Sequence, residues 1–234
     1  MENKYKLTDN TLEITNSKGD ITILHQIEAL KDFKYASKGE LGGYIESESN
    51  LSQEGNCWVG YGARVLENSV VTDNVLVEGD SEIYNSRLLD NAIVSNCLLV
   101  KNSSILDNAI VRDVARVEDS TIAENADIRG MESSVVNSVL KGTCKIFETH
   151  ISNAEIIGNA FIQGLGDYMV FKNWWSSGRF ITWTRSNNLW KAGCFYGTGE
   201  ELIKKAFKDS LISGKEYSRV VKYVNDILKD YSSL

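Results

Sequence analysis

The stretch NCWVGYGARVLENSVVTDNVLVEGD, residues 56–80, decides the fold of this 234-residue chain. An Asn, Asp or Gly recurs in it every six residues, at Asn56, Gly62, Asn68, Asn74 and Asp80. Each of them is followed three positions later by an aliphatic residue: Val59, Val65, Val71, Val77 and, just past the stretch, Ile83. An internal repeat of fixed period is stronger evidence for architecture than local propensity.

The same unit, a corner residue followed by a small residue, a variable residue and an aliphatic residue, continues along the chain at intervals of five or six. The predicted aliphatic positions are 59, 65, 71, 77, 83, 88, 94, 99, 105, 111, 117, 122, 128, 135, 140, 146, 151, 156 and 162. The spacing of three or four that an amphipathic helix needs is not sustained, which argues against helices here.

The unit has a direct physical interpretation. The small and the aliphatic residue are two positions apart, so both point to one side of a short strand while the residue between them points outward. Asn, Asp and Gly tolerate the left-handed backbone conformation of a sharp corner. Three such strands close a triangular coil of about 18 residues, and coils stack as parallel strands. We predict a mainly β fold, a left-handed parallel β-helix of about six triangular coils.

The flanks of the repeat predict two smaller units. Residues 1–49 are expected to form an N-terminal cap with a hairpin around residues 16–20, and HQIEALKDF in it fits a strand or a short helical turn. Residues 50–164 form the β-helix. Residues 165–234 are expected to form a β-hairpin and two helices, with a turn at residues 186–188 and a capping box of Thr198 and Glu201. The last helix has one apolar face, consisting of Tyr217, Val220, Val221, Val224, Ile227 and Leu228.

One outer face of the predicted prism is apolar where a solvated wall would be polar. Its outward positions are Trp58, Leu76, Ile93 and Ile110, followed further along by Phe161. A contiguous exposed apolar stripe marks a contact surface, so we expect these residues to form the interface of a homotrimer. The alternative is that a terminal segment of the same chain covers this face.

The charge and composition of the chain argue against several classes of partner. The net charge is −7 and the pI about 5.0, which argues against a nucleic-acid polymer or an anionic membrane as partner. No apolar run approaches a membrane span and the N-terminus lacks an apolar signal core. The four cysteines, Cys57, Cys97, Cys144 and Cys194, form no CxxC pair. We therefore expect the cytoplasm of a bacterial host, no metal site and no cofactor.

The C-terminal unit carries the candidate ligand-binding residues, which are aromatic and basic. They are Trp174, Trp175, Arg179, Trp183, Arg185, Trp190 and Lys191. Rings can stack on a nucleobase while guanidinium and ammonium groups take phosphates, so the set suits a small anionic ligand such as a cyclic nucleotide or an ADP-ribose derivative. The alternative is that the rings form the core of a small domain and the cations its solvated rim.

Only two histidines are available for acid–base chemistry. His25 precedes the repeat, and His150 occupies an outward position on a polar face. A histidine on a prism wall could serve as the general base of acyl transfer. The alternative is a solvated surface residue.

The segment GELGGYIESESNLSQEGNCWVGYGARV, residues 39–65, resembles the entry segment of a bacterial and phage family of hexapeptide-repeat β-helix proteins, many of which carry a transferase label. AGCFYGTGEEL, residues 192–202, is similar to a small C-terminal module of phage-encoded members. The resemblance covers residues 20–202 and implies the fold and a phage or prophage context. It implies no activity, because the transferase label follows the shared fold.

The sequence therefore leaves three candidate functions. The favoured one is a non-catalytic trimeric protein of phage origin that sequesters a small anionic ligand, such as a nucleotide-type messenger of host immunity. The second is a hexapeptide-type acyltransferase that uses His150. The third is a structural scaffold whose aromatic module docks a protein.

Overall fold

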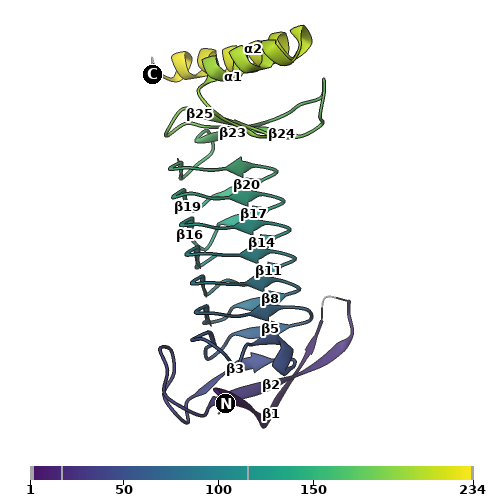
Figure 1. Ribbon diagram of the computed structural model, residues 1–234, viewed down its shortest axis with the longest axis vertical. Coiled ribbons are helices and arrows are strands. Elements are labelled where there is room, and N and C mark those ends of the chain that lie inside the picture. Colours follow the sequence, from purple (N-terminus) through teal and green to yellow (C-terminus); the bar gives the residue numbers. More distant parts are fainter. Residues whose placement is uncertain (1–2, 17, 115, 233–234) are drawn as a thin grey trace.

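The computed structural model describes residues 3–16, 18–114 and 116–232. It is a tall stack of coils with an antiparallel sheet at its N-terminal end and a small module of sheet and helices at its C-terminal end (Figure 1). The chain climbs the stack from one end to the other, so that residues about one coil apart in sequence lie side by side.

The stack has three walls of parallel strands. The first wall consists of β3 (Leu41–Ile45), β5 (Arg64–Leu66), β8 (Glu82–Tyr84), β11 (Val100–Lys101), β14 (Arg116–Glu118), β17 (Ser134–Val136) and β20 (His150–Ser152). The second wall consists of β4 (Trp58–Val59), β7 (Leu76–Glu78), β10 (Ile93–Ser95), β13 (Ile110–Arg112), β16 (Asp127–Arg129), β19 (Lys145–Phe147) and β22 (Phe161–Ile162). The third wall consists of β6 (Val70–Val71), β9 (Arg87–Leu88), β12 (Ser104–Ile105), β15 (Thr121–Ile122), β18 (Val139–Leu140) and β21 (Glu155–Ile156).

The predicted aliphatic positions form the interior of this β-solenoid. All of them except position 99 have fully buried side chains, including those between residues 128 and 146. At the exception, Val100 takes the inward place and pairs with Ile83 and Val117 of the neighbouring coils, while Leu99 is half-buried on the outside. The predicted position 99 is therefore wrong by one residue.

The reason lies in the corner between the first and third walls. There the chain turns with one residue in the left-handed conformation, as at Asn102 and Asp119 with φ of 49° and 48°. The serine after it accepts a hydrogen bond from the next coil: the Ser120 N–H donates to the Ser103 Oγ at 3.1 Å. A stacked corner must repeat its geometry from coil to coil, so the short five-residue step stays at this corner and Val100, not Leu99, faces inward.

A second corner, between the third and second walls, is held by a ladder of asparagine side chains. The amide of each donates to the carbonyl oxygen of the next, from Asn56 to Asn74 at 2.9 Å and from Asn74 to Asn91 at 3.1 Å. The ladder continues through Asn108 to Asn125. The prediction that Asn itself takes the left-handed conformation is wrong at this corner: the residue before it does so, as at Asp73 and Asp90 with φ of 57° and 64°. The Asn side chains instead form hydrogen bonds between coils that pairing of backbones alone does not supply.

The number of coils is about seven, not six, because the seven-stranded second wall is matched by seven parallel strands in the first. The extra coil begins at β3, where Tyr44 and Ile45 pair in parallel with Arg64 and Val65. The sequence hides this strand because it has glycines in place of the repeat unit. A Cβ on Gly43 would lie 2.3 Å from the Ala63 carbonyl oxygen, so only glycine fits.

The N-terminal segment forms an antiparallel hairpin that continues the first wall. Strands β1 (Tyr5–Thr15) and β2 (Ile21–Ala29) pair around the predicted turn, and the Asn16 N–H donates to the Asp20 carbonyl at 2.8 Å. HQIEA belongs to strand β2, so the strand alternative is correct for this part. A short 3₁₀ helix, η1 (Glu48–Asn50), follows β3. The hairpin leaves the stack as a projecting arm beside the lowest coils (Figure 1).

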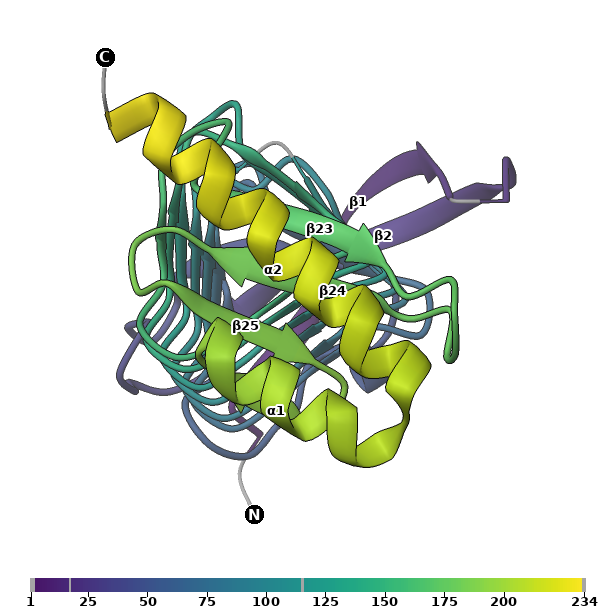
Figure 2. The same ribbon diagram turned by 90° about the horizontal axis from the view of Figure 1, so that it is seen from above.

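The C-terminal module is a four-stranded antiparallel sheet covered by two helices. Its elements are β23 (Tyr168–Lys172), β24 (Phe180–Thr184), β25 (Leu189–Ala192), β26 (Phe195–Gly197), α1 (Gly199–Asp209) and α2 (Leu211–Ser232). The predicted turn between β24 and β25 and the capping box at Thr198 are confirmed. The sheet lies across the last coil, with α1 and α2 on its far side (Figure 2).

We predict that the same change, isoleucine to alanine, destabilises the fold more in the interior than on a wall. Ile105→Ala removes a fully buried side chain and is expected to destabilise the fold by about 2–5 kcal/mol. Ile110→Ala removes the same atoms from an outward, half-buried position and is expected to cost less than half as much in the isolated chain. Urea denaturation followed by circular dichroism measures both; equal losses would contradict the assignment of the interior.

Candidate functional site

The solvent side of the first wall brings His150 and Ser134 together at its C-terminal end. The two residues are register partners on β20 and β17, and the His150 Nδ1 lies 2.7 Å from the Ser134 Oγ. The His150 side chain is exposed, as predicted for an outward position. A hydrogen bond between Nδ1 and Oγ orients the imidazole ring on the wall.

The strand that carries His150 is also anchored to the C-terminal module. The Tyr168 phenol donates a hydrogen bond to the His150 carbonyl oxygen at 2.9 Å. One coil before Ser134, the same outward row holds Arg116, which forms an ion pair of 3.5 Å with Glu118. The site is therefore an exposed imidazole oriented by a hydroxyl, with a cation nearby on the same wall.

The sequence places Ser134 and His150 one coil apart on one face, which the register confirms. It gives no sign of their hydrogen bond or of the contact with Tyr168, because both depend on side-chain conformation and on how the module packs. The residue before Arg116 in this row is Leu99, because Val100 is the inward residue that pairs with Val117.

The predicted aromatic ligand site is divided between a core and several surfaces. Trp183 and Trp190 are 0% and 2% exposed and pack with Leu202, Val221 and Val224 between the sheet and the helices. The Trp183 indole N–H donates to Asn188 at 2.9 Å. For these two rings the alternative is correct: they form the core of the module and present no face to a ligand.

The remaining candidates lie apart from one another. Trp174 is 73% exposed on the loop between β23 and β24, and Trp175 beside it packs edge-on against Tyr217 with ring centroids 5.1 Å apart. Lys191 is tied to Glu155 of the third wall by an ion pair of 2.8 Å. Arg185 lines a separate cavity of about 390 Å³ beside α2. The seven predicted side chains do not converge on one site.

Arg179 lines the larger cavity at this end of the molecule. A groove of about 600 Å³ runs between the module and the corner of the last coils. Arg179, Phe180 and the exposed Cys194 lie on the module side. Asp119, Asn137 and Asn153 lie on the prism side, where Asn137 donates to Asn153 at 2.6 Å. The groove combines a cation, an aromatic ring and amide groups with the carboxylates of Asp119 and Glu155, so Arg179 is the group there that could attract an anionic ligand.

The apolar stripe of the second wall is covered at its start. Trp58 is 2% exposed, and the ring of Phe33 from the N-terminal segment packs against it edge-on at 5.4 Å. Trp58 therefore packs against another segment of the same chain. The prediction that it is an exposed interface residue is wrong. Leu76, Ile93 and Ile110 follow in register and are half-buried. Phe161 is 42% exposed and 5.8 Å from Phe147.

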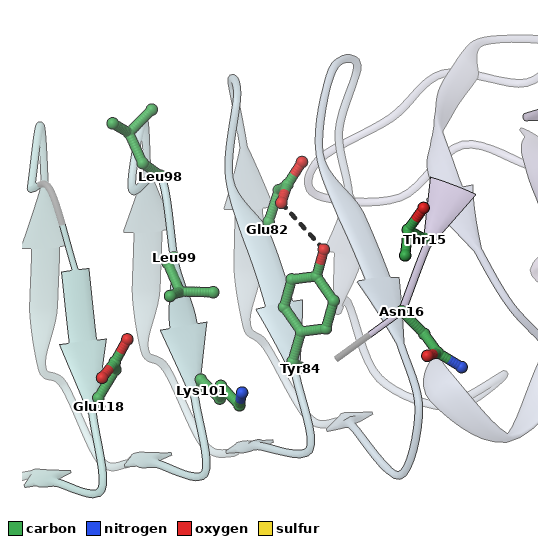
Figure 3. Close-up of a pocket in the computed structure, with 8 residues that line it drawn as sticks. All are labelled: Thr15, Asn16, Glu82, Tyr84, Leu98, Leu99, Lys101 and Glu118. Carbon is green, nitrogen blue, oxygen red and sulfur yellow. Dashed lines mark hydrogen bonds between the residues drawn. The ribbon is translucent and has the colours of Figure 1, made fainter. Parts of the chain in front are cut away.

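A further pocket, of about 370 Å³, lies between the first wall and the hairpin arm (Figure 3). Thr15 and Asn16 border it from the arm, while Tyr84, Leu99 and Lys101 line it from the wall. The Tyr84 phenol donates to Glu82 at 3.0 Å, and Glu82 pairs with Arg64. The sequence did not predict this pocket, because it exists only where the arm folds back along the wall.

In the part of the chain that the structure describes, no three His, Cys, Asp or Glu side chains gather as metal ligands. Neither helix among the described residues is long and apolar enough to cross a membrane.

Comparison with known proteins finds a short local similarity. Over 63 residues, 26% of this chain, the sequence is 36% identical to a protein of Escherichia coli (strain K12) named as the uncharacterized acetyltransferase YdcK. The matched stretch spans only 19% of that protein. No family model matches the chain.

We predict that Tyr84 makes the fold sensitive to alkaline pH. Burial, together with the Glu82 carboxylate, raises the pKa of the Tyr84 phenol to about 12. A raised pKa means that the folded state holds the proton more tightly, so this stabilisation is complete below an unfolded pKa of about 10 and declines as the pH rises toward 12.

The test compares thermal unfolding of the wild type and Tyr84→Phe across this pH range. The wild type is expected to lose more stability between pH ~10 and ~12 than the variant, which has no phenol to ionise at this position. Parallel pH profiles for the two proteins would contradict the prediction.

Proposed function

We propose that this protein is an acyltransferase whose general base is His150 on the first wall. The observation that carries the proposal is the hydrogen bond of 2.7 Å between the His150 Nδ1 and the Ser134 Oγ at an exposed position. The local similarity to a protein named as an acetyltransferase supports it. The substrates are an acyl thioester as donor and a small amine or alcohol as acceptor.

In the proposed mechanism each group has one role. With the proton on Nδ1 donated to Ser134, the Nε2 of His150 is a free base facing solvent. It takes the proton of the acceptor as the acceptor nitrogen or oxygen bonds to the acyl carbon. The bond from carbon to sulfur then breaks, and the proton passes from Nε2 to the departing thiolate. Arg116 on the same row is available to a phosphate of the donor.

We place this reaction in a homotrimer of left-handed β-helices. The half-buried aliphatic row of Leu76, Ile93 and Ile110 on the second wall supports an interface there, without Trp58. In such an assembly a wall of a second subunit closes the site that one chain leaves open. We further propose the cytoplasm of a bacterial host, because the four cysteines form no CxxC pair, and a phage or prophage origin, because residues 39–65 and 192–202 resemble phage-encoded proteins.

We predict that His150→Gln lowers acyl transfer from acetyl coenzyme A by about 100-fold or more, because the general base is lost. His25→Gln, at the other histidine, is the matched control and is expected to leave the rate unchanged. Release of the free thiol measures both. Full activity in His150→Gln would contradict the proposal, and so would the absence of turnover with a panel of acyl donors and acceptors.

Ser134→Ala separates two uses of the same hydrogen bond. If Ser134 only orients the ring, the rate falls roughly tenfold or less, whereas a serine that carries the acyl group would be indispensable. We expect the smaller loss.

A second candidate is the sequestration of a small anionic ligand without catalysis, for which the groove beneath Arg179 is the supporting observation. Cyclic di- and trinucleotides and ADP-ribose derivatives are the ligands to titrate by calorimetry. Arg179→Gln is expected to weaken a binding ligand about tenfold, and Arg185→Gln, outside the groove, is expected to have no effect. No heat with any of these ligands would exclude this function and leave docking of a protein as the role of the module.

A further inference from the structure

A lysine and a cysteine are buried together where the N-terminal strand meets the first coils. Lys4 is 1% exposed and Cys57 is fully buried, although they are 53 positions apart in the chain. The Lys4 Nζ lies 3.1 Å from the Cys57 Sγ. It also donates to the carbonyl oxygens of Cys57 and Glu54 at 2.8 and 3.2 Å. The amine is thus fixed against the thiol by two further bonds.

Backbone carbonyls and one aromatic ring surround the pair, and the Cys57 thiol lies 3.5 and 3.6 Å from the carbonyl oxygens of Ser52 and Glu54. The ring of Phe33 lies 5.5 Å from the Lys4 Nζ. Burial lowers the pKa of the Lys4 amine and raises the pKa of the Cys57 thiol, so each group is shifted toward its neutral form. A neutral amine has a free electron pair and is the nucleophilic form of lysine. The two groups are therefore not held together mainly as an ion pair of an ammonium and a thiolate.

We infer that Lys4 and Cys57 form an oxidative cross-link in which one oxygen atom joins the lysine nitrogen to the cysteine sulfur. The separation of 3.1 Å is that of a hydrogen bond, and inserting one bridging atom changes it less than a direct bond from nitrogen to sulfur would. The oxidant is hydrogen peroxide, a molecule small enough to reach the pair when the chain end opens locally.

The reaction balances with two molecules of peroxide. The first oxidises the thiol by two electrons to a sulfenic acid and leaves as water. The second oxidises the amine nitrogen by two electrons as the bond from nitrogen to the sulfenic oxygen forms. In this step one hydrogen from nitrogen and the hydrogen of the sulfenic acid leave, and the peroxide becomes two waters. The product gains one oxygen and loses two hydrogens relative to the reduced protein.

The other cysteines lack this arrangement and act as internal controls. Cys97 is also fully buried, but its thiol donates to the Leu99 carbonyl at 3.6 Å. Cys194 is exposed, and peroxide is expected to carry its sulfur to the sulfinic and sulfonic acids. Within residues 3–16, 18–114 and 116–232, Cys57 is the cysteine whose sulfur lies within hydrogen-bond distance of a lysine amine.

The cross-link would fasten the N-terminal strand to the prism. Lys4 precedes β1, and its backbone N–H already donates to the Gln53 side chain at 2.8 Å. A covalent tie between Lys4 and Cys57 closes a long loop and restricts the unfolded chain, so the oxidised protein is expected to be more stable than the reduced one.

The test treats the full chain with graded hydrogen peroxide and maps the peptides by mass spectrometry. We expect a linked peptide pair containing Lys4 and Cys57, with one added oxygen and two hydrogens lost, which dithiothreitol converts back to the separate peptides. The linked fraction should unfold at a higher temperature and return to the original midpoint on reduction.

Two variants locate the link. Lys4→Met keeps the length and apolar stem of the side chain without the amine, and Cys57→Ser keeps the size and polarity of the thiol site; both should abolish the linked pair. If either variant fails to fold, the peptide map of the oxidised wild type alone tests the inference. The inference is overturned if Cys57 stays reduced at peroxide doses that fully oxidise Cys194, or if Cys57 is converted to sulfinic or sulfonic acid with Lys4 unlinked.

Discussion

The structure depends on one corner that four successive coils turn in the same way, at residues 85–86, 102–103, 119–120 and 137–138. A residue in the left-handed conformation ends the first wall, and the serine behind it offers its hydroxyl oxygen to the N–H of the next coil. Ser86, Ser103 and Ser120 form successive steps of this ladder, with distances of 3.0 and 3.1 Å. Since the bond is made between coils, it fixes the height and the register of each coil at once. The buried valine and isoleucine columns can then stack without gaps.

This constraint leaves the outward positions free. Corner and interior residues are committed to the fold, whereas the residue between them faces a wall and contributes little to coil stacking. Any chemistry on the prism is therefore expected in the outward rows, where Ser134 and His150 lie next to the C-terminal module. The same freedom explains the differing character of the walls, with Leu76, Ile93 and Ile110 on one and Arg64, Glu82 and Arg116 on another.

The interior was predictable from sequence because its period is set by backbone geometry. Val59, Ile128 and Ile162 lie where the count puts them. The one misplaced position, 99, lies in a run of three aliphatic residues, Leu98, Leu99 and Val100. Hydrophobicity cannot choose among them, and only the corner geometry selects Val100 as the inward residue. The strand that contains Gly43 could not be predicted from the repeat. Close packing against Ala63 requires a glycine there, and glycine does not match the repeat unit.

The candidate ligand-binding residues were harder to place from sequence than the interior of the β-solenoid. A cluster of tryptophans signals either a core or a binding surface, and the sequence does not say which face of the sheet each ring occupies. Trp183 and Trp190 proved to be core, because α1 and α2 fold over that face. The groove at Arg179 and the pair of Lys191 and Glu155 join segments far apart in the chain, so no local pattern could reveal them.

A crystal structure of the protein with coenzyme A or a non-hydrolysable acyl thioester analogue tests the proposed acyl transfer most directly. We predict that the thiol end lies on the first wall, with its sulfur within hydrogen-bond distance of the His150 Nε2. Binding of the molecule in the groove beneath Arg179, away from His150, or failure to bind at millimolar concentration, would contradict it.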